Sequence, residues 1–227
     1  MKRIVGILTT LVILTLGQTA WAGSVSNQDA VAGLKETLSR GAATAVGQLG
    51  KPGGFWGNDK LRIPLPDSLQ KGESLLRGLG MGKQADELKE TMNRAAESAV
   101  AEAKPLLVNA VKQMTVKDAQ AILTGGDDAA TQYFRRTTAT PLTAKFLPIV
   151  QKATARVQLA DQYNRLAGKA AKLHLLDTQD ANLDDYVTRK ALDGLYSVIA
   201  EQEKAIRHDP VGTGSKLLEK VFGGLLK

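Results

Sequence analysis

The sequence predicts an all-α fold: a single multi-helix domain of about eight to ten helices, orthogonal or bundle-like in arrangement, with no sheet. Apolar residues recur every three or four positions over most of the chain, which is the period of an amphipathic helix. Alternation with period two is nowhere sustained, and the β-branched residues stand in helical phase. No segment repeats at a fixed period, which argues against a solenoid.

The first 22 residues predict a secretory signal peptide. Two cations at positions 2 and 3 precede an apolar run over residues 4–16, and Ala20-Trp21-Ala22 forms a small-x-small cleavage site. We therefore expect cleavage between Ala22 and Gly23 and a periplasmic protein whose one domain covers residues 23–227. The apolar run is shorter than the about 20 residues that span a bilayer, and no later segment predicts a transmembrane helix.

Composition excludes several classes of site. The chain has no cysteine, so disulfides, thiolate metal ligands, cysteine nucleophiles and a cysteine-linked lipid anchor are ruled out. Removal of the two signal-peptide cations lowers the formal net charge from +7 to +5. That mild basic bias suits an anionic lipid or cell-wall surface. No stripe of Lys and Arg with interleaved aromatic residues occurs, so nucleic acid is not an expected partner.

The first helix of the mature chain begins at Ser26, which forms a capping box with Asp29, and ends at Gly50. Residues 51–66 then contain three prolines and three glycines, which predicts a long irregular loop over residues 50–66. Loops of this length in compact domains are either functional or disordered. Apolar residues argue for order here, since a solvated linker would not carry so many: Phe55, Trp56, Leu61, Ile63 and Leu65.

Two or three helices follow between residues 66 and 114. A short one starts at Pro66-Asp67-Ser68 and ends in the glycines at positions 78, 80 and 82, and a longer one follows in one apolar phase as far as Met114. Pro105 lies inside this phase and should kink or restart the helix. Alanine-rich faces predict close helix packing, at Ala95, Ala96, Ala99, Ala101, Ala153, Ala155, Ala170 and Ala171.

Residues 115–137 predict a tight helical hairpin. Thr115 and Asp118 have the spacing of a capping box. Gly125 and Gly126 are expected to end the first helix in the left-handed conformation, and the two aspartates that follow to cap the second. Acid at the start of the second helix and Arg135-Arg136 at its end match the helix dipole.

Three further helices are expected after the hairpin. Thr140-Pro141 begins a helix of about 30 residues, bent near Pro148. Asn182 caps another that ends at Asp209-Pro210. A short amphipathic helix over residues 214–226 closes the chain, and its apolar face can dock on the domain core or on an anionic membrane surface.

No catalytic residue, metal site or cofactor is predicted. His174 and His208 are too few and too far apart for a histidine-based metal site. The acidic residues between 177 and 185 lack the glycine and glutamate of an EF-hand loop. They fit a connector followed by the acidic first turn of the helix that Asn182 caps. The glycines before Lys83 lack the Walker pattern and fit a helix connector.

Two stretches combine aromatic and charged residues at a density that suits binding. Caps explain most of the polar residues of the hairpin, but its aromatic-arginine turn suits an anionic or aromatic ligand. The candidate binding residues are Trp56, Asn58 and Arg62 of the loop and Asp127, Asp128, Tyr133, Arg135 and Arg136 of the hairpin.

Seven stretches resemble one family. They are GLKETLSRGAATAVGQLG, GF-x-GN-x-x-LRIPLP at 54–66, NRAAESA at 93–99, MTVKDAQAILTGGDDAATQYFRR at 114–136, YVTRKALDGL at 186–195, EKAIRHDP at 203–210 and the closing LLEKVFG. Together they are similar to the bacterial domain of unknown function 4197. The resemblance implies an exported helical protein and assigns no catalytic residues.

Three functions follow as hypotheses. The first is a non-catalytic binding domain whose partner is an envelope protein or an anionic envelope component. The second is peripheral membrane association through the C-terminal helix. The third is an enzyme that acts on an envelope component through the carboxylates and arginines of the hairpin.

Overall fold

The computed structural model describes residues 27–172 and 181–209, which form eight helices and no strand. The all-α prediction is confirmed for this part of the chain. The helices are α1 (Asn27–Leu49), α2 (Asp67–Gly78), α3 (Gly82–Ala101), α4 (Lys104–Gln113), α5 (Val116–Thr124), α6 (Ala129–Thr154), α7 (Gln158–Lys172) and α8 (Leu183–His208).

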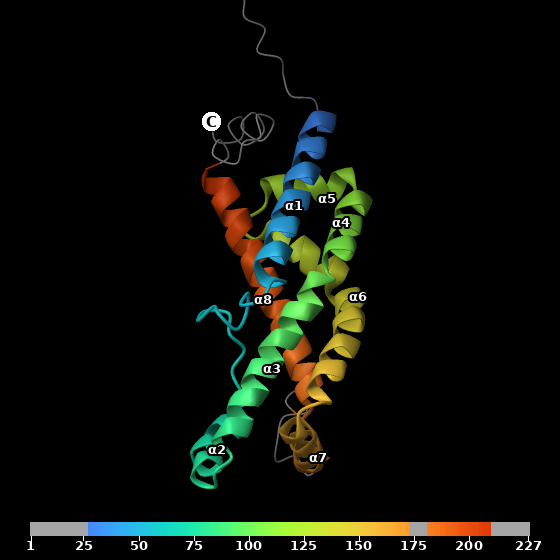
Figure 1. Cartoon of the computed structure of the whole chain (residues 1–227). Coiled ribbons are helices and arrows are strands. Elements are labelled where there is room, and N and C mark those ends of the chain that lie inside the picture. Colours follow the sequence, from blue (N-terminus) through green and yellow to red (C-terminus); the bar gives the residue numbers. More distant parts are fainter. Residues whose placement is uncertain (1–26, 173–180, 210–227) are drawn as a thin grey trace, which may run out of the picture.

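The helices form an elongated bundle (Figure 1). α6 and α8 pack against each other, and α3 packs against both. α1 packs against α4 and α8 at one end of the bundle, while α2 and α7 lie at the other end (Figure 1). The segment between α1 and α2 lies along the side of the bundle, next to α3 and α8 (Figure 1).

One apolar core runs along the bundle. Ala95, Ala96 and Ala99 are fully buried and allow the close approach to α3 that the sequence predicts. Ala155 is exposed, so its inclusion in a close-packed face was wrong. Ala101 is also exposed, but a Cβ atom built on Gly50 at the end of α1 would lie 2.9 Å from its Cα. The largest buried side chains are Tyr196, Phe55, Phe134, Phe146, Leu49, Leu65, Leu88, Met92, Leu107, Leu142, Leu183 and Leu195.

Several predicted helix boundaries are confirmed. α1 ends before Gly50, whose amide bonds the carbonyl of Val46. Pro105 restarts the helix, since it is the second residue of α4. The side chain of Asn182 accepts hydrogen bonds from two amides of the first turn of α8, and that helix ends at Asp209.

The predicted boundaries of the sixth helix were wrong. α6 does not end at Arg136, and no helix begins at Pro141; one helix runs through both Pro141 and Pro148 to Thr154. Its contacts with α3 and α8 offset the amides that the two prolines lack. The long helix expected after Pro141 instead breaks at residues 155–157, where Thr154 donates a hydrogen bond of 2.5 Å to Asp184 of α8.

Some predictions fall on residues outside the described ranges. These are the signal peptide and its cleavage site, Ser26, His174, the connector over residues 173–180 and the C-terminal helix over residues 214–226. Within the described ranges, none of the helices has both the length and the apolar character needed to cross a bilayer.

Candidate binding surface

The loop over residues 50–66 is fixed to α3 by one buried carboxylate. Oε1 of Glu97 accepts hydrogen bonds from the amides of Gly53, Phe55 and Trp56 at 3.1, 3.1 and 3.0 Å. The other oxygen of Glu97, Oε2, accepts a hydrogen bond from Nη1 of Arg94 at 3.0 Å. Gly53 has a φ of 86°, a conformation that glycine adopts without strain and that helps the three amides converge. The first half of the loop is therefore wrapped around Glu97.

The second half of the loop is fixed by a buried asparagine and a tyrosine. Asn93 accepts the amide of Ile63 at 2.8 Å and donates to the carbonyl of the same residue at 2.9 Å, as a neighbouring strand would. The hydroxyl of Tyr186 on α8 donates to the carbonyl of Pro64. The loop is thus bonded to helices on two sides, although it has no regular secondary structure.

Phe55 anchors the loop in the core against a glycine of α8. A Cβ atom built on Gly194 would lie 2.6 Å from Cε1 of Phe55. The ring is fully buried, so it has little room to move away. Gly194 is therefore required by the close approach of the loop and not by backbone conformation.

The loop and α8 enclose a groove of about 260 Å³, which we call the loop groove. The loop supplies one wall through residues 60–64, and α8 supplies the other. The polar side chains that line it are Lys60, Arg62, Lys190, Asp193 and Ser197.

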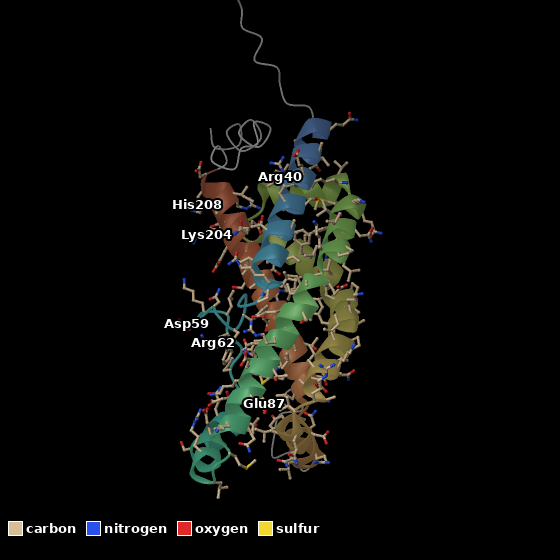
Figure 2. All side chains as sticks on the ribbon, viewed as in Figure 1. Arg40, Asp59, Arg62, Glu87, Lys204 and His208 are labelled. Atoms are coloured by element: carbon tan, nitrogen blue, oxygen red, sulfur yellow. The ribbon has the colours of Figure 1, made fainter. Side chains whose placement is uncertain are left out.

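Arg62 is held in place on this wall. Its Nε donates to the carbonyl of Trp56 at 2.8 Å, its Nη2 pairs with Asp59 at 2.9 Å, and its guanidinium lies 5.1 Å from the centroid of the Trp56 ring. Figure 2 shows Arg62 and Asp59 on the flank of the bundle, on the loop between α1 and α2. Asn58 shapes the turn beneath them by accepting the amide of Lys60.

Arg135 approaches the same region from α6. Its Nη1 lies 3.5 Å from Asp193, and its guanidinium lies 4.7 Å from the centroid of the Tyr196 ring. Arg62 and Arg135 therefore both lie near Asp193, although 73 positions separate them in the sequence.

The start of α6 is capped in an unexpected way. Asp128 occupies the cap position, but its side chain makes no cap hydrogen bond, so the predicted aspartate cap was wrong. The amides of Ala130 and Thr131 instead donate to the buried carboxylate of Glu203 on α8, each at 2.8 Å. Arg207 pairs with the same carboxylate at 2.8 Å. Because a core residue already satisfies these amides, Asp127 and Asp128 are left at the surface.

The end of α5 also differs from the prediction. Gly125 is extended, with φ −84° and ψ 177°, and not left-handed. A Cβ at this position would lie 2.7 Å from both the carbonyl oxygen of Ala121 and the Cβ of Ala129. Space at the α5–α6 junction, and not a positive φ, therefore calls for glycine. The capping box of Thr115 and Asp118 is present as predicted.

Tyr133 and Arg136 lie in a different cleft, of about 340 Å³, between α4, α5 and α6. Arg136 pairs with Asp118 at 3.1 Å and lies 5.6 Å from the centroid of the Tyr133 ring. The Tyr133 hydroxyl donates to the carbonyl of Ala110. The eight candidate residues therefore do not form one site: Trp56, Asn58, Arg62 and Arg135 gather near the loop groove, and the others lie apart from it.

Residues 24–223 match the model of a family described as "Protein of unknown function (DUF4197)". The chain belongs to the DUF4197 family. No curated protein and no solved structure matches it.

Sequence reasoning missed the buried polar residues that support the DUF4197 loop and helix start. Asn93, Glu97 and Glu203 were not predicted as structural residues, yet each is buried and fully bonded. A signal was present, because Glu97 follows Asn93 by one turn on the buried face of α3, and Glu203 follows Ile199 by one turn on that of α8. A carboxylate in the apolar phase of a helix indicates a buried partner.

The pKa shifts of Asp118, Tyr133 and Tyr196 have local structural causes. Hydrogen bonds from the hydroxyl and amide of Thr115 lower the pKa of Asp118, and Arg136 adds a smaller effect. Burial raises the pKa of Tyr133 and of Tyr196. Within residues 27–172 and 181–209, no three His, Asp or Glu side chains are grouped so that they could hold a metal ion.

Proposed function

We propose that this DUF4197 protein is a non-catalytic binding domain of the cell envelope, exported to the periplasm, which contacts its partner through the loop over residues 50–66 and the adjoining face of α8. The partner is an envelope protein or an anionic envelope component. The observation that carries the proposal is that two buried side chains, Glu97 and Asn93, hold this irregular loop in place by hydrogen bonds to its backbone.

A loop that is ordered before binding loses little conformational entropy when a partner binds. The exposed face of this loop carries Trp56 and Arg62, stacked on each other. Tryptophan and arginine are enriched among the residues that dominate binding energy at protein interfaces. Lys190 and Arg135 extend the cationic character of the surface onto α8 and α6, which favours an acidic partner.

The export component rests on the signal-peptide pattern of the first 22 residues. Mass spectrometry of protein released from the periplasm should give an N-terminus at Gly23. Recovery of the full-length chain in the cytoplasmic fraction alone would contradict export.

Binding is tested by quantitative capture from a detergent-treated envelope extract. The double variant Trp56→Ala/Arg62→Ala should lose at least one captured component by about tenfold, which corresponds to about 1.4 kcal/mol. The matched control is Arg40→Ala/Lys204→Ala, which removes cations from α1 and from the C-terminal end of α8, away from Arg62 (Figure 2). Equal recovery with the loop variant and the control, at equal helicity, would reject this surface.

A further inference from the structure

We propose that the loop groove binds a phosphorylated polyol, meaning a phosphate ester that carries free hydroxyl groups next to the phosphate. This inference rests on the binding role proposed above and names the chemical class of the ligand.

Three cations and one acid line the groove. Lys60, Arg62 and Lys190 line it, and neither lysine forms an ion pair within the described residues. The acid that pairs with Arg62 is Asp59, whose side chain is 90% exposed, so water screens most of that interaction. Asp193, the one acid in the lining, is itself within 3.5 Å of Arg135.

Each wall of the groove has a cation beside an aromatic ring. Arg62 lies over Trp56, with its Nε and Nη2 already bonded and the N–H groups of Nη1 left to donate. Lys190 lies 5.7 Å from the centroid of the Tyr186 ring, and the hydroxyl of that ring bonds the loop carbonyl at Pro64. A guanidinium and an ammonium on opposite sides of one groove suit the oxygens of a phosphate group.

Two clusters of backbone amides that could bind an anion are already filled by the protein's own carboxylates. Glu97 occupies the convergent amides of the loop, and Glu203 occupies the amides at the start of α6. An external anion would have to displace a buried glutamate at either place. The loop groove is open to solvent and needs no such displacement.

The α8 wall favours a ligand with hydroxyl groups over bare phosphate. Asp193 and Ser197 are one turn apart on the same face of α8 and both line the groove. A carboxylate repels a second anion but accepts hydrogen bonds from hydroxyl groups, and a serine hydroxyl can donate or accept. The volume of about 260 Å³ is below the about 300–1,000 Å³ of pockets for drug-sized ligands, so it suits a small headgroup.

The experiment uses the chain from Gly23 to Lys227 with glycerophosphate, inorganic phosphate and glycerol as probes in NMR titrations. Glycerophosphate should shift the amides of residues 60–64 and 190–197 and bind more tightly than phosphate, and glycerol alone should not bind. Arg62→Gln and Lys190→Gln should each weaken glycerophosphate binding by about tenfold. Lys204→Gln, a charge-matched control on the same helix, should leave it unchanged (Figure 2).

Asp193→Asn tests the choice between polyol phosphate and bare phosphate. The variant should bind inorganic phosphate more tightly than the unaltered chain does. The ratio of its affinity for glycerophosphate to its affinity for phosphate should therefore be smaller. Equal affinity of the unaltered chain for both probes would overturn the polyol assignment, as would equal loss with Lys204→Gln. If no probe binds while the Trp56/Arg62 double variant still loses its captured envelope component, the ligand class is wrong and the proposed binding function stands.

Vesicles distinguish the source of the ligand. If the phosphate ester is a lipid headgroup, the protein should bind phosphatidylglycerol vesicles and not phosphatidylcholine vesicles, and Arg62→Gln should release it. If the ester is soluble, glycerophosphate should bind in the titration while both kinds of vesicle fail to. Vesicle binding that Arg62→Gln and Lys190→Gln leave unchanged would count against the groove.

Discussion

Replacement of Glu97 by alanine should release the first half of the loop from α3. In the native structure this carboxylate accepts the amides of Gly53, Phe55 and Trp56 and pairs with Arg94. Alanine removes all four interactions and adds none. The Glu97 side chain is 5% exposed, so water has little access to this carboxylate.

The size of the effect follows from the burial of the three amides. An unsatisfied buried donor costs about 1–3 kcal/mol. Only the Phe55 amide is in a fully buried bond, while the Gly53 and Trp56 bonds are part-buried and can be replaced in part by water. We therefore expect Glu97→Ala to lower the free energy of unfolding by about 3–5 kcal/mol. Glu97→Gln keeps the acceptor and loses the charge, and should cost about 1–2 kcal/mol.

The protein carries its own probe of this region. Only Trp21 and Trp56 occur in the sequence, so a chain that begins at Gly23 has Trp56 as its one tryptophan. Urea unfolding followed by tryptophan emission and by far-UV circular dichroism separates loop release from loss of helix. Glu97→Ala should shift the emission to longer wavelength at urea concentrations where helicity is intact.

The matched control for this experiment is Glu90→Ala. Glu90 also pairs with Arg94, at 3.3 Å, but half of its side chain is exposed and it bonds no loop amide. Its removal should cost no more than about 1 kcal/mol and leave the emission unchanged. A cost below about 1 kcal/mol for Glu97→Ala, or equal effects of the two variants, would refute the assignment of Glu97 as the loop anchor.

Three further predictions concern other parts of the fold. Glu203→Ala should lower the free energy of unfolding by about 3–5 kcal/mol, because two buried amides of α6 lose their acceptor; helicity in urea measures this, and a cost under about 1 kcal/mol contradicts it. Gly194→Ala should cost about 1–3 kcal/mol by its clash with the Phe55 ring, and Phe55→Leu should relieve part of it, so strictly additive costs in a double-mutant cycle count against the contact. Hydrogen bonds from Thr115 lower the pKa of Asp118, so the stabilisation from this carboxyl is complete above its unfolded pKa of about 3.9 and is lost as the pH falls through the lower folded value. Asp118→Asn should therefore lose less stability than the unaltered chain between pH 5 and pH 2, and parallel pH profiles would show that the lowered pKa is not coupled to folding.

Local signals predicted most of the helices, and failed where a distant residue decides the outcome. The cap of Asn182, the restart at Pro105 and the capping box at Thr115 all depend on residues within one turn of each other, and all three are present. Pro141 gives the opposite local signal, yet α6 continues through it because α3 and α8 pack along the helix. Propensity yields to tertiary packing in such cases.

The same distinction explains the candidate site. Trp56 and Arg62 were identified because aromatic and charged residues cluster in the loop, and they do form a stacked pair at the surface. No local pattern indicates that Asp193 and Lys190, more than 120 positions later, complete the groove. The hairpin candidates are likewise dense in sequence, but Arg135 and Arg136 lie at different sites because neighbouring positions on a helix point about 100° apart.

The two buried glutamates indicate which charged residues of this chain stabilise the fold and which are left for binding. Glu97 and Glu203 each collect amides that would otherwise attract an external anion, and each is balanced by an arginine three or four positions away on its own helix. Once these carboxylates are assigned to folding, Lys60, Lys190 and the half-exposed Arg62 beside the loop have no comparable internal role. A binding role placed at the loop groove is therefore consistent with a stable fold, because Arg62→Gln and Lys190→Gln remove surface charges and no buried bond. Loss of ligand without loss of stability in those variants, and loss of stability in Glu97→Ala, is the combination that this division requires.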